Sequence, residues 1–511
     1  MSARVHPGES EVFVPASRAE WLSAGGAMLV FLALSVAHSL TRCPWWDEGM
    51  YADVAVSFRN FGHLGSSLVD PHGFLDWPAV HQYTYWQLPL YFITLGTWFR
   101  LVPVTVVWMR LFSVMWGCIF VVSWFVVVRS LSRKEPLALL VASVVALDYT
   151  SVLTASDGRM DMMCASLGLA GLASYFWFRD SHWTRGLVLA ACFGAASLFC
   201  HPMGVVTNVA IASMVLLDWR RIKWGALLAA SLPYLLGVAF CLYYIHQAPD
   251  VFLAQSRAMS RYRVSGLEEI LRNIFNDASK RYIHYYYENY TGIAKLKIAS
   301  LIFPVGGVVG LLADPDLRSQ PLGKRLLFLA CVAYVGVAVV DNQKFPHYLV
   351  FSVPVLTACG AVWVYARWQK GGWSRFLACG LLVVSIGATV GGVGYNIYKN
   401  EYRNLYHPAV AAIQSSLPPG GLVMGGSELG FALGFGPPLV DDRYLGYFSG
   451  KTPDVYVVNG FYFPMRRSPG SIHAWESSLT TLRSRYHLSF ENQAYRIYVR
   501  NDVPVALQPT N

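Results

Sequence analysis

The sequence predicts an all-α polytopic membrane protein with about eleven transmembrane helices, followed by a small C-terminal soluble α/β domain. Of the 511 residues, 55% are hydrophobic and only 14% are charged, and the mean hydropathy is +0.39. A soluble protein of this length does not need so apolar a composition. Long apolar runs recur up to residue 396, and the basic residues stand in short flanks between them, which is the charge pattern of membrane topology.

Cysteines and net charge exclude other classes. The nine cysteines lie almost all inside apolar runs, so they indicate core packing rather than a disulfide framework or a metal cluster. The net charge of +10 is spread over loops, so nucleic acid is not an expected partner. The segment Met1–Ala16 has no signal-peptide pattern, and the first run is therefore expected to be a retained signal-anchor helix.

Eleven apolar runs are long enough, or nearly so, to cross a bilayer, which takes about 20 helical residues. In chain order they are 21–40, 105–128, 136–156, 160–178, 184–200, 203–218, 223–245, 297–313, 324–341, 347–366 and 375–396.

A twelfth run, 88–99, is too short, because a dozen helical residues cover about 18 Å of a hydrocarbon core of about 30 Å. Charge supports this. With 88–99 excluded and the N-terminus inside, every short inside loop is basic, as the positive-inside rule requires. We therefore expect 88–99 to be an amphipathic helix on the outer face, within one long external loop, 42–104.

The predicted organisation has three parts. Residues 1–20 form a cytoplasmic N-terminus, and residues 21–396 form the membrane domain with external loops 42–104 and 247–296. Residues 397–511 form the external domain, where Pro-Gly turns separate short apolar runs such as 455–458 and 495–499.

Asp47 and Glu48 follow the first apolar run, at the point where it emerges into water. A pair of carboxylates at such a boundary is costly to keep unless it has a function. A carboxylate there can act as a general base towards an acceptor hydroxyl. The alternative is an interfacial acidic pair whose side chains reach to water.

Asp157 and Asp161 flank Arg159 at the start of the 160–178 run. Helical spacing places the two aspartates on one face. Both also suit a helix N-terminus, where acidic side chains complement the helix dipole. A cation is disfavoured there, so Arg159 points to an anionic ligand.

Two further external turns carry polar residues. Lys344, His347 and Tyr348 stand within five residues beside a helix-starting proline, and together they predict a phosphate clamp. His201 lies in a turn between two runs, where a histidine is a ligand candidate or a structural hydrogen-bonding residue.

The loop 247–296 is rich in arginine and tyrosine, and we expect it both to bind anionic head groups and to form an aromatic belt on membrane lipids. These residues are Arg257, Arg261, Tyr262, Arg263, Tyr282, Tyr285, Tyr286 and Tyr287. No metal motif is present, although His63, His72 and His81 share a loop with Asp47 and Glu48. No cofactor is required, and a divalent metal ion stays an open alternative.

The order of these motifs resembles the GT-C membrane glycosyltransferases, in particular the bacterial protein O-mannosyltransferase and lipid A aminoarabinose transferase branch. The motifs are the Asp47-Glu48 pair, the Pro89-Leu90-Tyr91 segment, Arg110 at the start of a span, the Arg159-x-Asp161 corner, the His201-Pro202-x-Gly204 turn and the Lys344-x-Pro346-x-Tyr348 turn. The branch has a Glu-Lys pair where this chain has Trp86-Gln87, so the resemblance leaves the sugar and the acceptor open.

The resemblance implies an inverting glycosyltransferase of the bacterial inner membrane, with its active site and C-terminal domain in the periplasm. The donor would be a polyprenyl-phosphate-linked sugar, and the acceptor a lipid, a glycan or a protein. Asp47 would be the base and Glu48 would position or tune it. The lipid phosphate or the substrate would be held by Arg159, Asp161, Lys344, His347, Tyr348 and His201.

Two other classes of protein are alternatives to a glycosyltransferase. A multi-pass transporter or flippase would have ionisable residues near the middle of several spans and some repeat symmetry. A scaffold protein would tolerate the loss of every outer-face charge.

Overall fold

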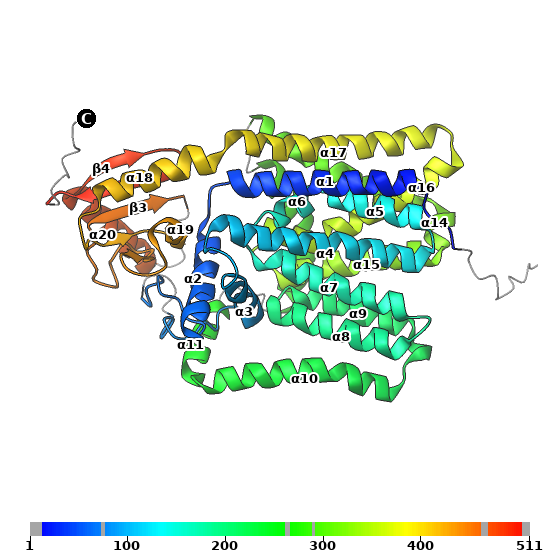
Figure 1. The fold of residues 1–511 in the computed structure, drawn as a ribbon, viewed down its shortest axis with the longest axis horizontal. Helices are drawn as coiled ribbons and strands as arrows, with labels where there is room; N and C mark the ends of the chain where they lie inside the picture. Colours follow the sequence, from blue (N-terminus) through cyan, green and yellow to red (C-terminus); the bar gives the residue numbers. More distant parts are fainter. Residues whose placement is uncertain (1–12, 73–76, 261–265, 289–291, 461–468, 503–511) are drawn as a thin grey trace, which may run out of the picture.

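The protein is a long helical bundle with a small α/β domain at one end (Figure 1). The computed structural model describes residues 13–72, 77–260, 266–288, 292–460 and 469–502. The bundle has two ends, which we call the domain end, next to the C-terminal domain, and the far end, opposite to it. The long helices of the bundle alternate in direction between the two ends.

Each of the eleven predicted runs coincides with a helix or with a broken pair of helices. They are α1 (Arg18–Thr41), α4 (Val106–Ser132), α5 (Glu135–Ala146) with α6 (Tyr149–Ala155), α7 (Met160–Phe178), α8 (Trp183–Cys200), α9 (Gly204–Leu217), α10 (Trp224–His246), η3 (Gly292–Leu301) with α13 (Ile302–Ala313), α15 (Pro321–Val340), η4 (Pro346–Phe351) with α16 (Val353–Lys370), and α17 (Trp373–Lys399). The short elements η1 (Trp219–Arg221) and α14 (Pro315–Ser319) connect helices at the far end.

Eight helices of the described chain are long and apolar enough to cross a membrane. The pair α5 and α6, bent by 62°, makes up to nine. The remaining two predicted runs correspond to α7 and to α9, which has only 14 residues. The predicted class, a polytopic helical membrane protein with a C-terminal sheet, is confirmed.

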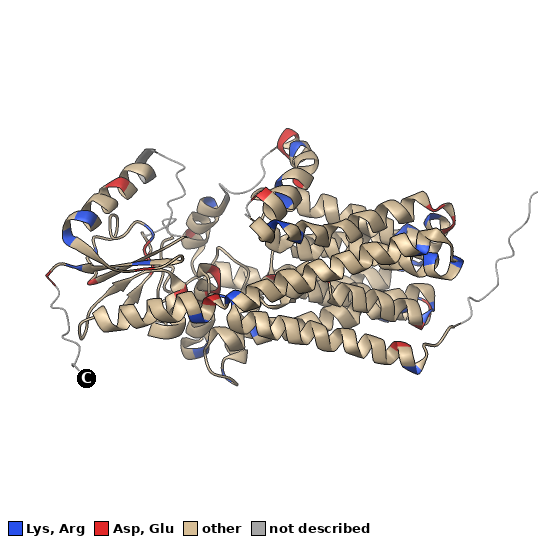
Figure 2. Cartoon of the chain, turned by 90° about the horizontal axis from the view of Figure 1, so that it is seen from above, with Lys and Arg blue, Asp and Glu red and all other residues tan. Residues whose placement is uncertain are grey.

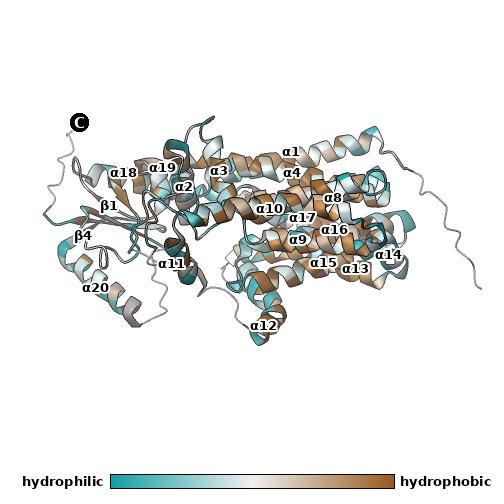
Figure 3. Cartoon of the chain, turned by 90° about the horizontal axis from the view of Figure 1, so that it is seen from below, coloured by the Kyte–Doolittle hydropathy of each residue, from teal (hydrophilic) through white to brown (hydrophobic). Residues whose placement is uncertain are grey.

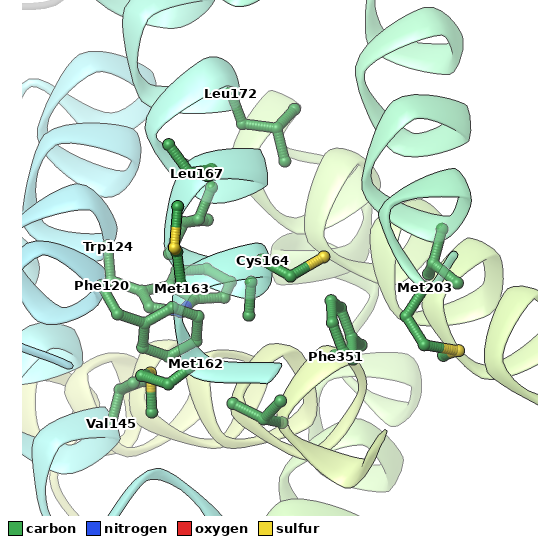
Figure 4. Packing of buried hydrophobic residues seen from close by; sticks show 14 of the residues in the cluster. Phe120, Trp124, Val145, Met162, Met163, Cys164, Leu167, Leu172, Met203 and Phe351 are labelled. Atoms are coloured by element: carbon green, nitrogen blue, oxygen red, sulfur yellow. The ribbon is translucent and has the colours of Figure 1, made fainter. Parts of the chain in front are cut away.

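The core of the bundle is built around α7, which packs between α4 and α8 and is buried along almost its whole length. Figure 4 shows Met162 and Met163 of α7 beside Phe120 and Trp124 of α4, while Cys164 points to the other side, towards α8. The sequence of α7 is apolar all round, as expected for a helix surrounded by others.

The first predicted external loop contains two helices at the domain end, α2 (Trp46–Phe61) and α3 (Pro89–Trp98). With ten residues, α3 is too short to span, as predicted. It is not amphipathic, however, because its sequence is apolar on nearly all sides. Tyr91, Phe92 and Leu95 are fully buried, and α3 packs against α2.

The predicted loop 247–296 is largely helical where it is described. It contains α11 (Pro249–Ser260), α12 (Leu267–Asp277) and the π-helical η2 (Ala278–Glu288), followed by the start of η3. The Arg261-Tyr262-Arg263 segment, for which a head-group role was expected, lies outside the described residues.

The C-terminal domain continues directly from α17 through η5 (Tyr402–Tyr406) into α18 (His407–Ser416). Its five-stranded sheet has the order β2-β1-β3-β5-β4. The strands are β1 (Val423–Met424), β2 (Leu439–Val440), β3 (Val455–Asn459), β4 (Tyr486–Glu491) and β5 (Tyr495–Arg500). β1 is parallel to β2 and β3, whereas β5 is antiparallel to β3 and β4.

Side chains of the sheet form two separate cores. On one face Val423, Val457 and Ile497 pack with Ile413 of α18. On the other face Met424 and Tyr456 pack with residues of α20 (Pro469–Arg485). The strands predicted at 455–458 and 495–499 correspond to β3 and β5. Two short helices, η6 (Ser427–Leu429) and α19 (Gly430–Leu433), follow β1.

Charge and hydropathy divide the molecule along its long axis. Figure 2 shows lysine and arginine gathered at the far end, with few charges along the helices between the two ends. Figure 3 shows the bundle predominantly hydrophobic and the C-terminal domain more hydrophilic. The turns singled out in the sequence, around residues 47, 159, 201 and 344, all lie at the domain end.

Candidate active site

Glu48 lies at the centre of a buried network that fixes the start of α2. Its carboxylate receives two hydrogen bonds from Arg110 of α4, at 2.7 and 2.6 Å, and both side chains are fully buried. The backbone N–H groups of Gly158 and Trp45 donate to it at 2.8 and 3.3 Å. Burial acts to raise the pKa of Glu48, but Arg110 outweighs burial and the pKa is lowered.

Arg110 also binds the last turn of α1, because its Nη1 donates to the carbonyl oxygens of Ser39 and Arg42 at 2.8 Å each. A cation at a helix C-terminus satisfies the orphan carbonyl groups there. Glu48 and Arg110 therefore join α1, α2, α4 and the turn before α7, and they hold the neighbouring Asp47 in place.

Asp47 forms an ion pair with Arg159 and keeps one fifth of its side chain exposed. Arg159 also donates from Nε to Asp161 Oδ2 at 2.6 Å. Its guanidinium carbon lies 5.0 Å from the ring centroid of Trp45 and 5.7 Å from that of Tyr51. Burial raises the pKa of Asp47, while Arg159 and Arg443 act in the opposite direction. The pair thus joins an accessible carboxylate to a buried cation.

His347 and Asp157 lie next to the Asp47–Arg159 pair. The indole of Trp45 lies between Arg159 and His347 and contacts both. The His347 and Trp45 rings lie 4.9 Å apart, and His347 Nδ1 is 3.7 Å from Asp157 Oδ2. Asp157 is also paired with Arg42 at the end of α1. The structure therefore brings Asp47, Arg159, Asp161 and His347 into one cluster.

His201 and Tyr348 flank the cluster, with ring centroids 5.3 Å apart. His201 Nδ1 accepts a hydrogen bond of 3.1 Å from the backbone N–H of Met203, which closes the turn between α8 and α9. Burial lowers the pKa of His201 to about 4, so the imidazole is neutral at pH 7. Through these contacts His201 stabilises the turn between α8 and α9.

The structure places the ammonium group of Lys344, predicted to hold phosphate, in another network. It donates to the carbonyl of Ala338 at 2.9 Å and pairs with Asp277 at 2.9 Å. Arg281 pairs with Asp277 at 3.0 Å and with Asp341 at 2.7 Å in the same buried group. With both contacts inside the protein, the Lys344 ammonium is not presented to a ligand as the predicted phosphate clamp requires.

A cavity of about 610 Å³ opens beside the cluster, between α1, α6, η2, η3 and α17. Arg42, Asp157, His347 and Glu401 line it at the domain end, and Lys297 lines it further along η3, next to Leu296. The rest is apolar and runs down α17. The lining residues there are Leu153, Ile293, Leu296, Val384, Gly387, Ala388, Gly391 and Gly392. From Val384 to Asn396 the α17 wall is about 18 Å long, at 1.5 Å per residue.

The C-terminal domain contacts the same site. Trp46 Nε1 donates to Asp441 Oδ2 at 2.5 Å, and Asp441 also receives hydrogen bonds from Ser427. The guanidinium carbon of Arg443 lies 3.6 Å from the ring centroid of Trp46. An arginine of the distant domain therefore stands one residue from Asp47.

Sequence reasoning missed the functional surroundings of Asp47. Arg443 and Asp441 carry no recognisable motif, and they reach α2 only through the tertiary fold. Arg42 had a signal that could have been used, since it is a cation at the domain end of a span, against the topology bias. Among the described residues, no group of three or more His, Cys, Asp or Glu side chains is placed to hold a metal ion.

No protein-family model and no curated protein matches the chain, but solved structures do. ArnT from Cupriavidus metallidurans bound to undecaprenyl phosphate superposes with a TM-score of 0.59 at 13% identity, over 94% of this chain and 98% of that one. Its apo state gives 0.55 at 14% identity, over 93% and 98%. The apo oligosaccharyltransferase of Archaeoglobus fulgidus gives 0.54 at 11% identity, over 96% and 76%. The chain therefore has the GT-C fold, as its motif order predicted.

Proposed function

We propose that the protein is a membrane glycosyltransferase that moves a sugar from a polyprenyl-phosphate carrier to an acceptor hydroxyl, with Asp47 as general base. The observation that carries the proposal is the position of Asp47, an accessible carboxylate paired with Arg159, in a cluster whose neighbours Asp157 and His347 line a cavity with polar and apolar walls. The GT-C fold shared with ArnT and with an oligosaccharyltransferase supports the same class.

In this reaction the acceptor oxygen attacks the anomeric carbon as the bond from that carbon to the phosphate oxygen breaks. Asp47 accepts the acceptor proton, and the polyprenyl phosphate leaves with its negative charge. A single displacement of this kind inverts the anomeric centre. Burial raises the pKa of Asp47, which makes its carboxylate a stronger proton acceptor than a fully hydrated aspartate.

The cavity matches the two parts of the proposed donor. At the domain end it offers the cation Arg42, which suits a phosphate group, together with His347, while Lys297 lies further along η3. Its apolar part lies along α17 inside the bundle, where a prenyl chain would be shielded from water. ArnT, which has the same fold, was crystallised with undecaprenyl phosphate.

The charge distribution supports a periplasmic location for this site. Basic residues cluster in the connections at the far end (Figure 2), which the positive-inside rule assigns to the cytoplasm. The domain end, with Asp47 and the C-terminal domain, then faces the periplasm of a bacterial inner membrane. A flippase is disfavoured, because the middle of the bundle carries few charges along the helices of Figure 2.

Asp47→Asn tests the proposal in proteoliposomes supplied with a panel of polyprenyl-phosphate sugars and candidate lipid, glycan and peptide acceptors, with products identified by mass spectrometry. Loss of a general base is expected to slow transfer by about 10²- to 10⁴-fold. The matched control is Asp180→Asn, which removes a half-exposed carboxylate at the far end and leaves transfer unchanged. Full transfer by Asp47→Asn would refute its role, and no transfer by the wild type with any donor would refute the function.

A further inference from the structure

The helix α12 has an apolar side that no part of the described protein covers. Leu267, Leu271 and Phe275 recur every fourth residue, so they lie along one side of the helix. Their side chains are 72%, 48% and 80% exposed. Ile283, in the following η2, is also 48% exposed. Three large apolar side chains exposed on one helix side mark a contact surface rather than scattered surface residues.

Two polar residues of α12, Asn273 and Asp277, face the protein instead. Asn273 is buried and donates to Asn342 at 3.1 Å. Asp277 is fully buried in its ion pairs with Arg281 and Lys344. A surface helix of a soluble protein has the opposite arrangement, with its apolar side inward. The inverted pattern indicates that the surroundings of the outer side are themselves apolar.

The position of α12 along the bundle identifies those surroundings. Tyr334 of α15 donates to the carbonyl of Ile274 at 3.0 Å. Tyr334 stands six residues before the end of α15 at Val340, which is about 9 Å along the helix axis. Since α15 is one of the candidate spans, α12 lies beside the last turns of a span at the domain end. Figure 3 shows α12 projecting sideways from the bundle.

We propose that α12 lies in the surface of the lipid leaflet at the domain end, with Leu267, Leu271 and Phe275 inserted among the acyl chains. The exposed polar residues Glu268 and Arg272 sit on the side of the helix next to this apolar stripe, where head groups and water are available. The proposal rests on the membrane fold and is independent of the enzymatic activity.

Lipid contact on α12 also braces the candidate site. Arg281 donates to the carbonyl of Phe345 at 2.7 Å and pairs with Asp341, while Lys344 pairs with Asp277. These bonds tie the end of α12 to the turn that carries His347 and Tyr348. The role of Lys344 is thus to connect the turn to a helix seated on the bilayer.

The test replaces Phe275 with the photo-cross-linking residue p-benzoylphenylalanine in the full-length protein, reconstituted in bilayers of phosphatidylethanolamine and phosphatidylglycerol. Irradiation followed by mass spectrometry locates the adducts. Position 275 is expected to give phospholipid adducts with a yield close to that of the same residue at Leu235, an exposed site within the span α10.

The negative control is the same substitution at Leu488, a half-exposed residue of β4 in the C-terminal domain. A lipid yield at 275 no higher than at 488 would overturn the proposal. A covalent dimer through 275 in place of lipid adducts would also overturn it, because a second copy of the chain would then cover the apolar side.

Discussion

Asp47 and Glu48 are adjacent residues in opposite electrostatic surroundings. Burial acts to raise the pKa of both carboxyl groups. At Glu48 the two hydrogen bonds from Arg110 lower the pKa by more than burial raises it. The Glu48 carboxylate therefore stays charged and connects the helices around it. At Asp47 burial prevails over Arg159 and Arg443, so its pKa is raised. Of the two, Asp47 is the carboxyl group whose surroundings favour taking up a proton.

Arg443→Gln is expected to move the acid limb of the pH–rate profile to higher pH. The groups that act on Asp47 are the cations Arg159 and Arg443, the carboxylate Asp161, and the phenols of Tyr51 and Tyr348. A base works when deprotonated, so the rate falls as pH drops through its pKa. Removing a cation raises that pKa, and the fall then begins at higher pH.

The measurement is the initial transfer rate across pH, with Arg496→Gln, at an exposed residue of β5, as the control. An unchanged acid limb in Arg443→Gln would show that Arg443 does not act on the base.

Glu48→Gln is expected to destabilise the protein, whereas Asp47→Asn is not. The glutamine leaves the fully buried Arg110 without its counter-charge, which costs about 3–5 kcal/mol in comparable buried pairs. Thermal unfolding in detergent measures the difference as a lowered midpoint. Adding Arg110→Met to Glu48→Gln removes the orphaned charge and should recover part of the loss. Equal midpoints for Glu48→Gln and the wild type would contradict the structural role.

At the scale of elements, α17 shapes the cavity through its small residues. A Cβ built at Gly391 meets nothing within 4 Å, and Gly391 lines the cavity. Gly394 has equally open surroundings but does not line the cavity. The same substitution at the two glycines therefore distinguishes a loss of cavity volume from the general effect of adding a side chain to α17.

Gly391→Leu is expected to weaken donor binding and raise KM for the polyprenyl-phosphate sugar, because the new side chain enters the space proposed for the prenyl chain. Gly394→Leu should bind as the wild type does. Native mass spectrometry with polyprenyl phosphate measures the binding affinity of the two variants. Leucine has a higher helix propensity than glycine, and this gain is the same in both variants, so the two substitutions affect the stability of α17 equally. The same affinity in both variants would exclude this cavity as the prenyl site.

The elements were predicted more completely than the site, for physical reasons. Span length and apolar composition are local properties, so every predicted run coincides with a helix. The direction of one side chain is not local. Lys344 adopts a left-handed backbone conformation, with φ of 62°, and its ammonium turns to Asp277 on a different element. A sequence shows that a turn carries a lysine, but not which carboxylate that lysine meets.

At the scale of the whole molecule, the C-terminal domain is docked on the segment that carries Asp47. Main-chain hydrogen bonds of 2.9 Å join Asp441 to Leu68 and Asp70, and Lys451 pairs with Asp70 at 2.6 Å. The contact between Trp46 and Asp441 spans 395 residues of sequence. No local pattern predicts such a contact, which is why the role of this domain was open from the sequence.

Gly49→Ala tests whether this docking matters for activity. A Cβ at Gly49 would stand 2.1 Å from the carbonyl carbon of Ser427, so either α2 or the domain must shift. A displacement of about 1 Å near the reacting groups can cost about a hundredfold in rate. We therefore expect a loss of transfer of that order together with faster proteolysis of the C-terminal domain. The control, Gly25→Ala in α1, places a Cβ in open space and should change neither property. Wild-type transfer by Gly49→Ala with the domain readily cleaved would show that the domain is dispensable for the chemistry, and that Arg443 does not act on Asp47.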